Sequence, residues 1–65
     1  MATVDGQIVR VGDWVSFKSD IEQSGQVSAV LSGSRLVLTN ERGFQGEYIG
    51  GSYTTIQQAR DCWLD

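Results

Sequence analysis

The chain has 65 residues, a formal net charge of −3, eight glycines, one cysteine, no proline and no histidine. A chain of this length forms one domain and buries only roughly 60% of its unfolded surface, and a lone cysteine leaves it without an internal disulfide. The absence of histidine removes the usual general base, the Ser-His-Asp arrangement and the imidazole ligands of zinc. The sequence therefore predicts a protein that is not an enzyme.

Charge and hydropathy restrict the partners and the compartment. Acidic residues outnumber basic ones in both halves of the chain, so neither half is a basic arm for phosphate backbones. One cysteine favours a reducing compartment. Apolar runs such as residues 36–38 are too short to span a bilayer, and the N-terminal residues lack a signal-peptide pattern. We therefore expect a cytoplasmic protein without membrane contact.

Residues 13–18 alternate with the period of two that is typical of a half-buried strand. The pattern predicts Val15 and Phe17 on the inner face of this strand and Trp14 on its outer face. Residues 20–25 show no such repeat, so they are predicted to form an exposed connection.

A predicted hairpin follows this connection. The alternation resumes over residues 26–32, whose apolar residues are Val27, Ala29 and Leu31. A Ser-Gly-Ser turn at residues 32–34 joins this strand to a third one over residues 35–40, with Leu36 and Leu38 inward. Two β-rich runs that flank a short turn are typical of a hairpin.

The last third of the chain changes character. Residues 41–43 are predicted to be a turn, residues 44–49 a fourth strand, and the glycine pair at 50–51 its end. The alternation stops in residues 54–60, where a threonine in capping position predicts a single turn of 3₁₀ or α helix. Residues 61–64 then give a short fifth strand.

Four strands in hairpin order, one helical turn and a last short strand are the layout of an SH3-like small barrel. Residues 11–64 resemble KOW-type and related barrels, most clearly in Val-Gly-Asp-Trp-Val-Ser-Phe at 11–17 and Ser-Gly-Gln-Val at 24–27. The resemblance implies an all-β, five-stranded SH3-like barrel with one short 3₁₀ or α turn before the last strand. We expect a single such domain over residues 1–65, with residues 1–9 as a loosely ordered N-terminal segment.

Three narrower resemblances add to this one. Signalling SH3 domains carry an Ala-Leu-Tyr-Asp-Tyr-like segment that this chain lacks. Plasmid-encoded type II dihydrofolate reductases resemble it at Gly-Asp 12–13, Gly-Gln-Val 25–27 and Gly-Ser 51–52. Their Val-Gln-Ile-Tyr active segment is replaced here by Tyr-Thr-Thr-Ile at 53–56, so no catalytic residue is carried over from them. The chain also resembles small uncharacterised proteins of tailed bacteriophages, which implies a phage-encoded regulator of a host protein in the host cytoplasm.

Aromatic side chains are the predicted partner-binding residues. Trp14 either drapes over a neighbouring loop to extend the core or anchors a partner protein, and the pattern leaves both open. Phe44 and Tyr48 share one face of their predicted strand, and either of them can join Trp14 in an aromatic patch. At least one of these three is expected in the core. Tyr53 lies where such barrels present a shallow groove, and an outward Trp63 on an edge strand would be a natural dimer contact.

Two further features indicate structure rather than chemistry. The carboxylates of Asp20 and Glu22 lack the further oxygen ligands of a calcium loop, so no metal site is expected there. Cys62 is expected to be a small buried apolar group rather than a nucleophile.

The sequence predicts a binding module that engages another protein or another copy of itself and uses no cofactor or metal. The alternative is a KOW-like nucleic-acid-binding protein, in which cations neutralise phosphates while Trp14 or Phe44 stacks on bases. The cations of this alternative are Arg10, Lys18, Arg35, Arg42 and Arg60. An oligomeric reductase-like pore, with one site shared between subunits, is a third possibility.

Overall fold

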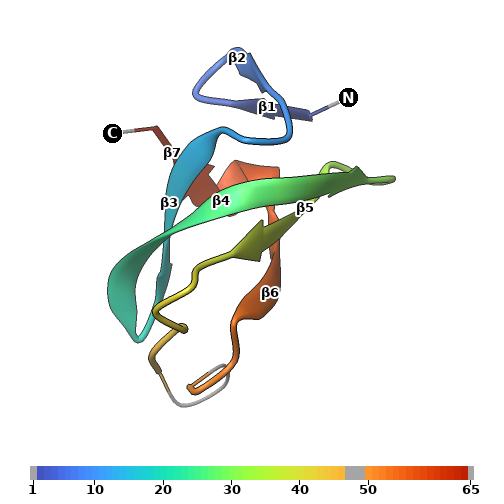
Figure 1. Ribbon diagram of the computed structural model, residues 1–65. Coiled ribbons are helices and arrows are strands. Elements are labelled where there is room, and N and C mark those ends of the chain that lie inside the picture. The colour runs from blue at the N-terminus through green and yellow to red at the C-terminus, as the bar shows by residue number, and fades with distance from the viewer. Residues whose placement is uncertain (1, 47–49, 65) are drawn as a thin grey trace.

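In the computed structural model, residues 2–46 and 50–64 are described. The strands are β1 (Ala2–Val4), β2 (Gln7–Val9), β3 (Trp14–Ser19), β4 (Ile21–Leu31), β5 (Arg35–Thr39), β6 (Thr54–Gln58) and β7 (Cys62–Trp63), with one 3₁₀ turn, η1 (Ala59–Asp61). β1 and β2 pair with each other, and the other strands form one antiparallel sheet in the order β6-β5-β4-β3-β7. Figure 1 shows the β1–β2 hairpin across one end of this sheet, the end at which both chain termini lie.

The alternation correctly predicts β3. Val15 and Phe17 are 1% and 0% exposed and face the core, whereas Trp14 points outward and is 54% exposed. The observed strand begins and ends one residue later than the predicted one. The inner face of β3 therefore follows directly from the period of two.

The predicted connection at residues 20–25 is wrong, because this segment is the first half of β4. β3 and β4 are paired from Ser19 with Ile21 down to Trp14 with Gln26, and the chain turns at Asp20, whose φ is 64°. The inner positions near the middle of this half-strand hold an amide, Gln23, and a glycine rather than large apolar side chains. The sequence therefore shows no alternation where a strand is present.

A β-bulge lies in the second half of β4, between Val27 and Ala29. One extra residue there reverses the facing of the residues that follow it. Val27 is buried as predicted, but Val30, paired with Leu36, packs against the core in place of Ala29 and Leu31. The prediction that Ala29 and Leu31 face inward is wrong for this reason.

The predicted turn at 32–34 and the strand after it are confirmed. Gly33 and Ser34 have positive φ values of 75° and 57°, and β5 begins at the next residue. Leu36 and Leu38 are both fully buried, as the alternation predicts. Short turns with positive φ match the right-handed twist of the strands that they join.

The chain after β5 differs from the prediction. Residues 44–46 are not a strand, and residues 47–49 of the predicted fourth strand lie outside the described residues. The predicted helical turn over 54–60 is wrong for residues 54–58, because Thr54–Gln58 is a strand that pairs along its whole length with β5. Among residues 2–46 and 50–64, only η1 is helical. The predicted last strand is confirmed as β7, which pairs with β3.

Residues 1–9 were expected to be loosely ordered, but residues 2–9 form a hairpin. Asp5 and Gly6, with φ values of 52° and 77°, make the turn between β1 and β2. The backbone N–H of Leu64 donates a hydrogen bond of 2.8 Å to the Asp5 carboxylate, so this turn is joined to the chain after β7. The hairpin is therefore part of the domain.

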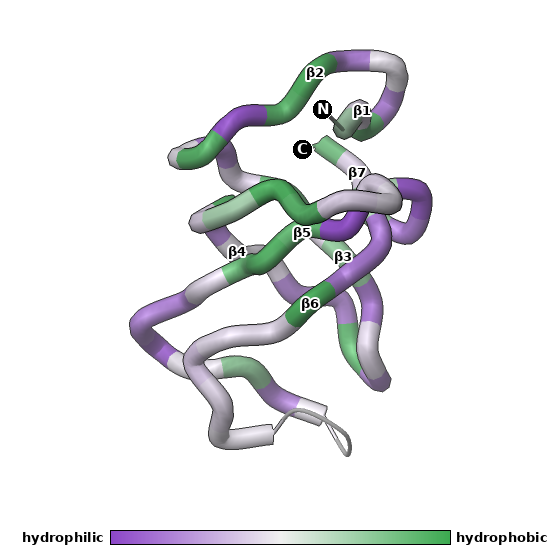
Figure 2. Tube along the Cα trace, turned by 90° about the vertical axis from the view of Figure 1, so that its right-hand side faces the viewer, coloured by the Kyte–Doolittle hydropathy of each residue, from purple (hydrophilic) through white to green (hydrophobic). Residues whose placement is uncertain are grey.

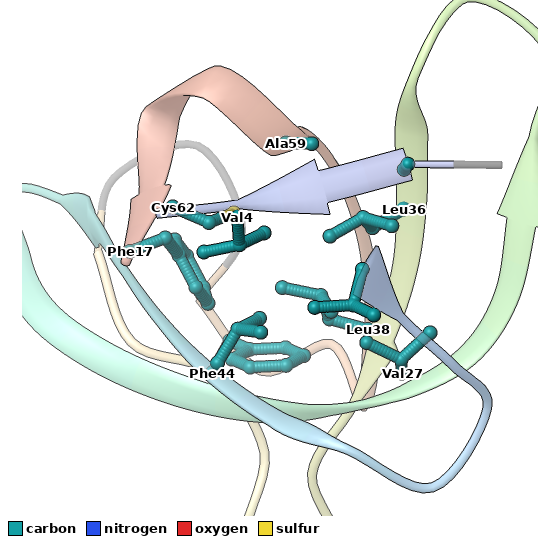
Figure 3. Close-up of a cluster of buried hydrophobic side chains, with 11 residues drawn as sticks. Val4, Phe17, Val27, Leu36, Leu38, Phe44, Ala59 and Cys62 are labelled. Carbon is teal, nitrogen blue, oxygen red and sulfur yellow. The ribbon is translucent and has the colours of Figure 1, made fainter. Parts of the chain in front are cut away.

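The core lies between the sheet and this hairpin, and Figure 3 shows it. Phe17 and Phe44 are in edge-to-face contact, with ring centroids 5.5 Å apart. Both rings belong to a buried cluster to which β1 through β5, η1 and β7 contribute. The buried apolar residues are Ala2, Val4, Val9, Val15, Phe17, Val27, Leu36, Leu38, Phe44, Ala59 and Cys62.

Candidate functional site

Trp14 begins β3 directly after a turn that is closed by several hydrogen bonds. The backbone N–H of Arg10 donates to the Asp13 carboxylate at 2.9 Å, and the N–H of Asp13 donates back to the Arg10 carbonyl at 3.0 Å. Between them Gly12, with a φ of 101°, adopts a conformation that other residues rarely take, and its N–H donates to the Val27 carbonyl at 2.8 Å. This turn fixes the backbone position at which the exposed Trp14 side chain leaves the outer face of the sheet.

A first groove, with a volume of about 530 Å³, lies on one side of Trp14. Its far wall is the turn after β5, which Asn40 anchors: the Asn40 amide donates to the Ser24 carbonyl at 3.0 Å and accepts from the Arg42 N–H at 2.9 Å. The walls are mostly polar. The lining residues are Trp14, Ser24, Gln26, Thr39, Asn40, Glu41 and Arg42.

A second groove, of about 400 Å³, lies on the other side of the same indole. It is formed where the β1–β2 hairpin meets the sheet, and Ile8 of the hairpin, 47% exposed, supplies an apolar side chain to it. Its lining residues are Gln7, Ile8, Val9, Asp13, Trp14 and Leu64. Trp14 is therefore a ridge between two shallow grooves, and its exposed ring can contact a ligand in either one.

Trp63 lies on the same face of the sheet. It pairs with Ser16, which is two residues after Trp14 and hence on the same side of β3. Trp63 is half-buried and borders a small hollow of about 180 Å³, which shares Ser24 with the first groove. The structure thus brings together two of the predicted aromatic residues, Trp14 and Trp63, on one surface.

The other predicted aromatic residues do not join them. Phe44 is 2% exposed and lies in the core, so it does not join Trp14 in an aromatic patch as predicted. Its burial agrees with the expectation that at least one of Trp14, Phe44 and Tyr48 lies in the core. Tyr48 lies outside the described residues. Tyr53 is 63% exposed just before β6, on the far side of β4 and β5 from Trp14 in the order of the sheet.

The five cations of the nucleic-acid alternative are all exposed and are spread over different elements. Arg42 lines the first groove next to Glu41, whereas Lys18 is paired across the β3–β4 hairpin with Glu22. Arg35 begins β5 and Arg60 lies in η1. Two of these cations are therefore near Trp14: Arg42 lines the same groove, and Arg10 belongs to the turn directly before β3.

Sequence reasoning missed most of the groove walls. Ile8 belongs to a hairpin that the alternation did not reveal, although Asp5-Gly6 between apolar runs is a strong hairpin signal. No local sequence pattern indicates the role of Asn40, because this role depends on a hydrogen bond to the distant Ser24 carbonyl.

The structure also places the groups that were considered for metal and thiol chemistry. No group of three or more Asp, Glu, Cys or His side chains there is placed to hold a metal ion. Cys62 is buried, and its thiol donates to the Gln58 carbonyl at 3.4 Å. Burial, with a smaller contribution from Asp61, raises the pKa of this thiol from 9.0 to about 11, which disfavours the reactive thiolate.

The raised pKa of Cys62 predicts a specific loss of stability at alkaline pH. Folding favours the protonated thiol, so its contribution is complete below about pH 9 and is lost as the pH rises to about 11. We expect the unfolding free energy of the wild type to fall by about 2 kcal/mol more than that of Cys62→Ala over this interval. Urea unfolding of both proteins between about pH 9 and pH 11 measures the difference between their unfolding free energies. The contributions of all other titrating groups cancel in this difference. If the two unfolding free energies fell in parallel with pH, the raised pKa of Cys62 would be contradicted.

Comparisons with known proteins add no relative: no family model, no curated protein and no solved structure matches the chain. Within residues 2–46 and 50–64, no helix has the length and apolar character needed to cross a membrane.

Proposed function

We propose that the protein is a non-enzymatic binding module that engages another protein through the surface around Trp14. The observation that carries this proposal is the position of the indole, 54% exposed on a fixed turn between grooves of about 530 and 400 Å³. A tryptophan side chain is large and has few rotatable bonds, so it loses little conformational entropy on contact. Such residues dominate the energetics of protein interfaces.

We further propose that the module is an SH3-like barrel. The connectivity supports this: β3 to β6 follow one another as antiparallel neighbours, and after η1 the chain returns to pair β7 with the free side of β3. In this arrangement the β1–β2 hairpin is an addition to the barrel that supplies one wall of the second groove.

The charge around Trp14 favours a protein over a nucleic acid. Arg42 is next to Glu41 in one groove, and Asp13 lines the other, within a protein whose net charge is −3. A nucleic-acid interface gains most of its affinity from several cations that contact successive phosphates. The surface around Trp14 instead suits a neutral or basic protein segment with an apolar side chain.

A binding experiment with two matched variants tests the proposal. Wild type, Trp14→Ala and Ile21→Ala are immobilised and exposed to a lysate of the cells that express the protein, and a retained protein is identified and purified. Titration calorimetry then gives its Kd for each variant. We expect Trp14→Ala to weaken binding about 30-fold or more, and Ile21→Ala, which removes an exposed apolar side chain that borders neither groove, to leave the Kd unchanged.

Two results would overturn the proposal. One is a retained protein whose Kd is the same for wild type and Trp14→Ala. The other is salt-sensitive binding of labelled single-stranded DNA or RNA that Arg42→Ala and Trp14→Ala both abolish, which would assign this surface to nucleic acid.

A further inference from the structure

The two grooves beside Trp14 differ in the charges that line them. The first is lined by Glu41 and Arg42, which are adjacent and opposite in charge, so it favours neither sign in a ligand. Among the described residues, the only charged one that lines the second groove is Asp13. Three aliphatic residues, from β2 and from the chain after β7, line it as well. The second groove therefore combines one carboxylate with apolar walls.

The apolar walls come from two parts of the chain that meet at this end of the sheet. Ile8 of β2 is exposed, and Leu64, directly after β7, is half-buried against the core. Figure 2 shows the hydrophobic β2 above the chain that follows β7. A side chain that enters the second groove therefore contacts aliphatic carbons as well as the Trp14 ring.

The Asp13 carboxylate retains acceptor capacity for a ligand. The backbone groups of Asp13 are already used, because its N–H donates to the Arg10 carbonyl and its carbonyl accepts from the Val27 N–H at 2.8 Å. Carboxylate Oδ2 accepts from the Arg10 N–H, whereas Oδ1 has no hydrogen-bond partner among the described residues. An ionised carboxylate accepts about four hydrogen bonds, so this exposed group can receive a further donor.

A second carboxylate lies close to the same groove. Oδ2 of Asp5 accepts from the backbone N–H of Leu64 at 2.8 Å, directly beside a residue that lines the groove. Arg10 belongs to the turn of Asp13 but is not among the residues that line the groove. The net charge of −3 adds to the local carboxylates, and such a protein attracts cationic groups and repels anionic ones.

The classes of side chain differ in how well they fit a carboxylate between apolar walls. An acidic side chain is repelled by Asp13. A purely apolar one contacts the walls but covers the carboxylate without giving it a partner, which costs free energy. A short polar one leaves the aliphatic walls in water. Lysine and arginine satisfy both features, because an apolar stem carries a cationic head that is also attracted to the face of an indole ring.

We propose that the partner of this module inserts a lysine or arginine side chain into the second groove, with its stem against the aliphatic walls and its cationic head on the Asp13 carboxylate, beside the Trp14 ring. This inference rests on the function proposed above, because it names the chemistry of the partner at the same surface. The second groove is then the one that selects the partner by charge.

A library of random displayed peptides tests which side chain the groove selects. The library is enriched on immobilised wild type, and we expect a lysine or arginine at one fixed position of the retained peptides. In the tightest of them this residue is replaced by norleucine for lysine or by citrulline for arginine, which keep a stem of similar length and remove the charge. Titration calorimetry is expected to show a Kd about tenfold higher for the uncharged peptide.

Two variants of equal net charge locate the contact. Asp13→Asn removes the charge but keeps an oxygen that can accept from the Arg10 N–H, and Glu41→Gln removes an equal charge from the first groove. We expect the charged and uncharged peptides to bind Asp13→Asn with nearly equal Kd values. In Glu41→Gln the tenfold difference between the two peptides is expected to remain.

A second pair of variants leaves the Asp13 turn unaltered. Ile8→Lys places a cation in the wall of the second groove and is expected to weaken binding of the charged peptide about tenfold or more. Ile21→Lys makes the same change at an isoleucine of the same exposure, 47%, that borders neither groove, and it is expected to leave the Kd unchanged. Circular dichroism of every variant verifies the fold.

The results separate this inference from the proposed function. Peptides that Trp14→Ala fails to bind but that share no basic residue would overturn the inference alone. Equal effects of charge removal from the peptide in Asp13→Asn and Glu41→Gln, or equal effects of the two lysine variants, would do the same. Peptides that bind Trp14→Ala as tightly as wild type, or a library from which wild type retains nothing, would overturn both.

Discussion

Replacing Phe44 by alanine is expected to lower the unfolding free energy by about 3 to 5 kcal/mol. The ring is 2% exposed, contacts Phe17 in an edge-to-face arrangement and packs against Gly25, so its removal leaves a cavity. A domain of 65 residues has roughly 3 to 10 kcal/mol of stability in total, and the variant is therefore expected to be largely unfolded. Urea unfolding followed by circular dichroism measures the loss.

Trp14→Ala is the matched control, since it removes a larger aromatic side chain from the surface. It is expected to change the unfolding free energy by about 0.5 kcal/mol or less. Equal losses for the two variants would contradict the division between Phe44 as a core residue and Trp14 as a surface residue.

Replacing Gly25 by valine is expected to have the second largest effect, a loss of about 3 kcal/mol. Gly25 is buried on β4, where the Phe44 ring crosses the strand. A Cβ at this position would lie 3.0 Å from the Cβ of Leu38 and 3.0 Å from Cζ of Phe44. The Leu38 Cβ is attached directly to its strand and cannot rotate away, so either the strands separate or the ring leaves the core.

Ala29→Val places the same side chain on the outer face of the same strand, where it is half-buried beside Val37. It is expected to change stability by about 0.5 kcal/mol or less. Thermal unfolding measures the stability of both variants. If Gly25→Val were tolerated as well as Ala29→Val, the close packing of Phe44 on β4 would be wrong.

The contacts around Phe44 show why the sequence misassigned its segment as a strand. The Gln23 side chain donates to the Gln45 carbonyl at 2.6 Å and accepts from the Gln45 N–H at 2.8 Å, so one amide satisfies both backbone groups that a neighbouring strand would otherwise pair. The Phe44 N–H donates to the Ser52 carbonyl at 2.8 Å. Local alternation cannot reveal that a side chain from β4 replaces a strand.

Where one face of a strand is fully apolar, the sequence predicted the fold correctly. β3 and β5 have large apolar residues at every second position in the core, so their alternation and the outward direction of Trp14 could be deduced. β4 could not, because Gly25 and Gln23 take inner positions and a bulge reverses the strand after Val27. β6 was missed for a related reason, since its inner residues are Thr55 and Gln57, joined by a hydrogen bond of 3.0 Å.

Only the central residue of the candidate site, Trp14, could be predicted from the sequence. The alternation places Trp14 on the outer face of β3. The grooves on either side of it are bordered by residues 7–9 and 39–42, which come to lie next to β3 only in the folded chain. The walls of a groove between loops depend on long-range contacts that no local pattern contains.

The hydrogen bond from Leu64 to Asp5 joins positions 59 residues apart. The β1–β2 hairpin can form locally, but Val4 and Ala2 are covered only after η1 and β7 have reached the same end of the sheet. Closing so long a loop is slow, so we expect this end of the core to form late in folding and the domain to fold in milliseconds to seconds. Deleting the β1–β2 hairpin and deleting η1 with β7 are then expected to expose the same end of the core. Either deletion is therefore expected to unfold the whole domain, because the domain behaves as a single cooperative unit.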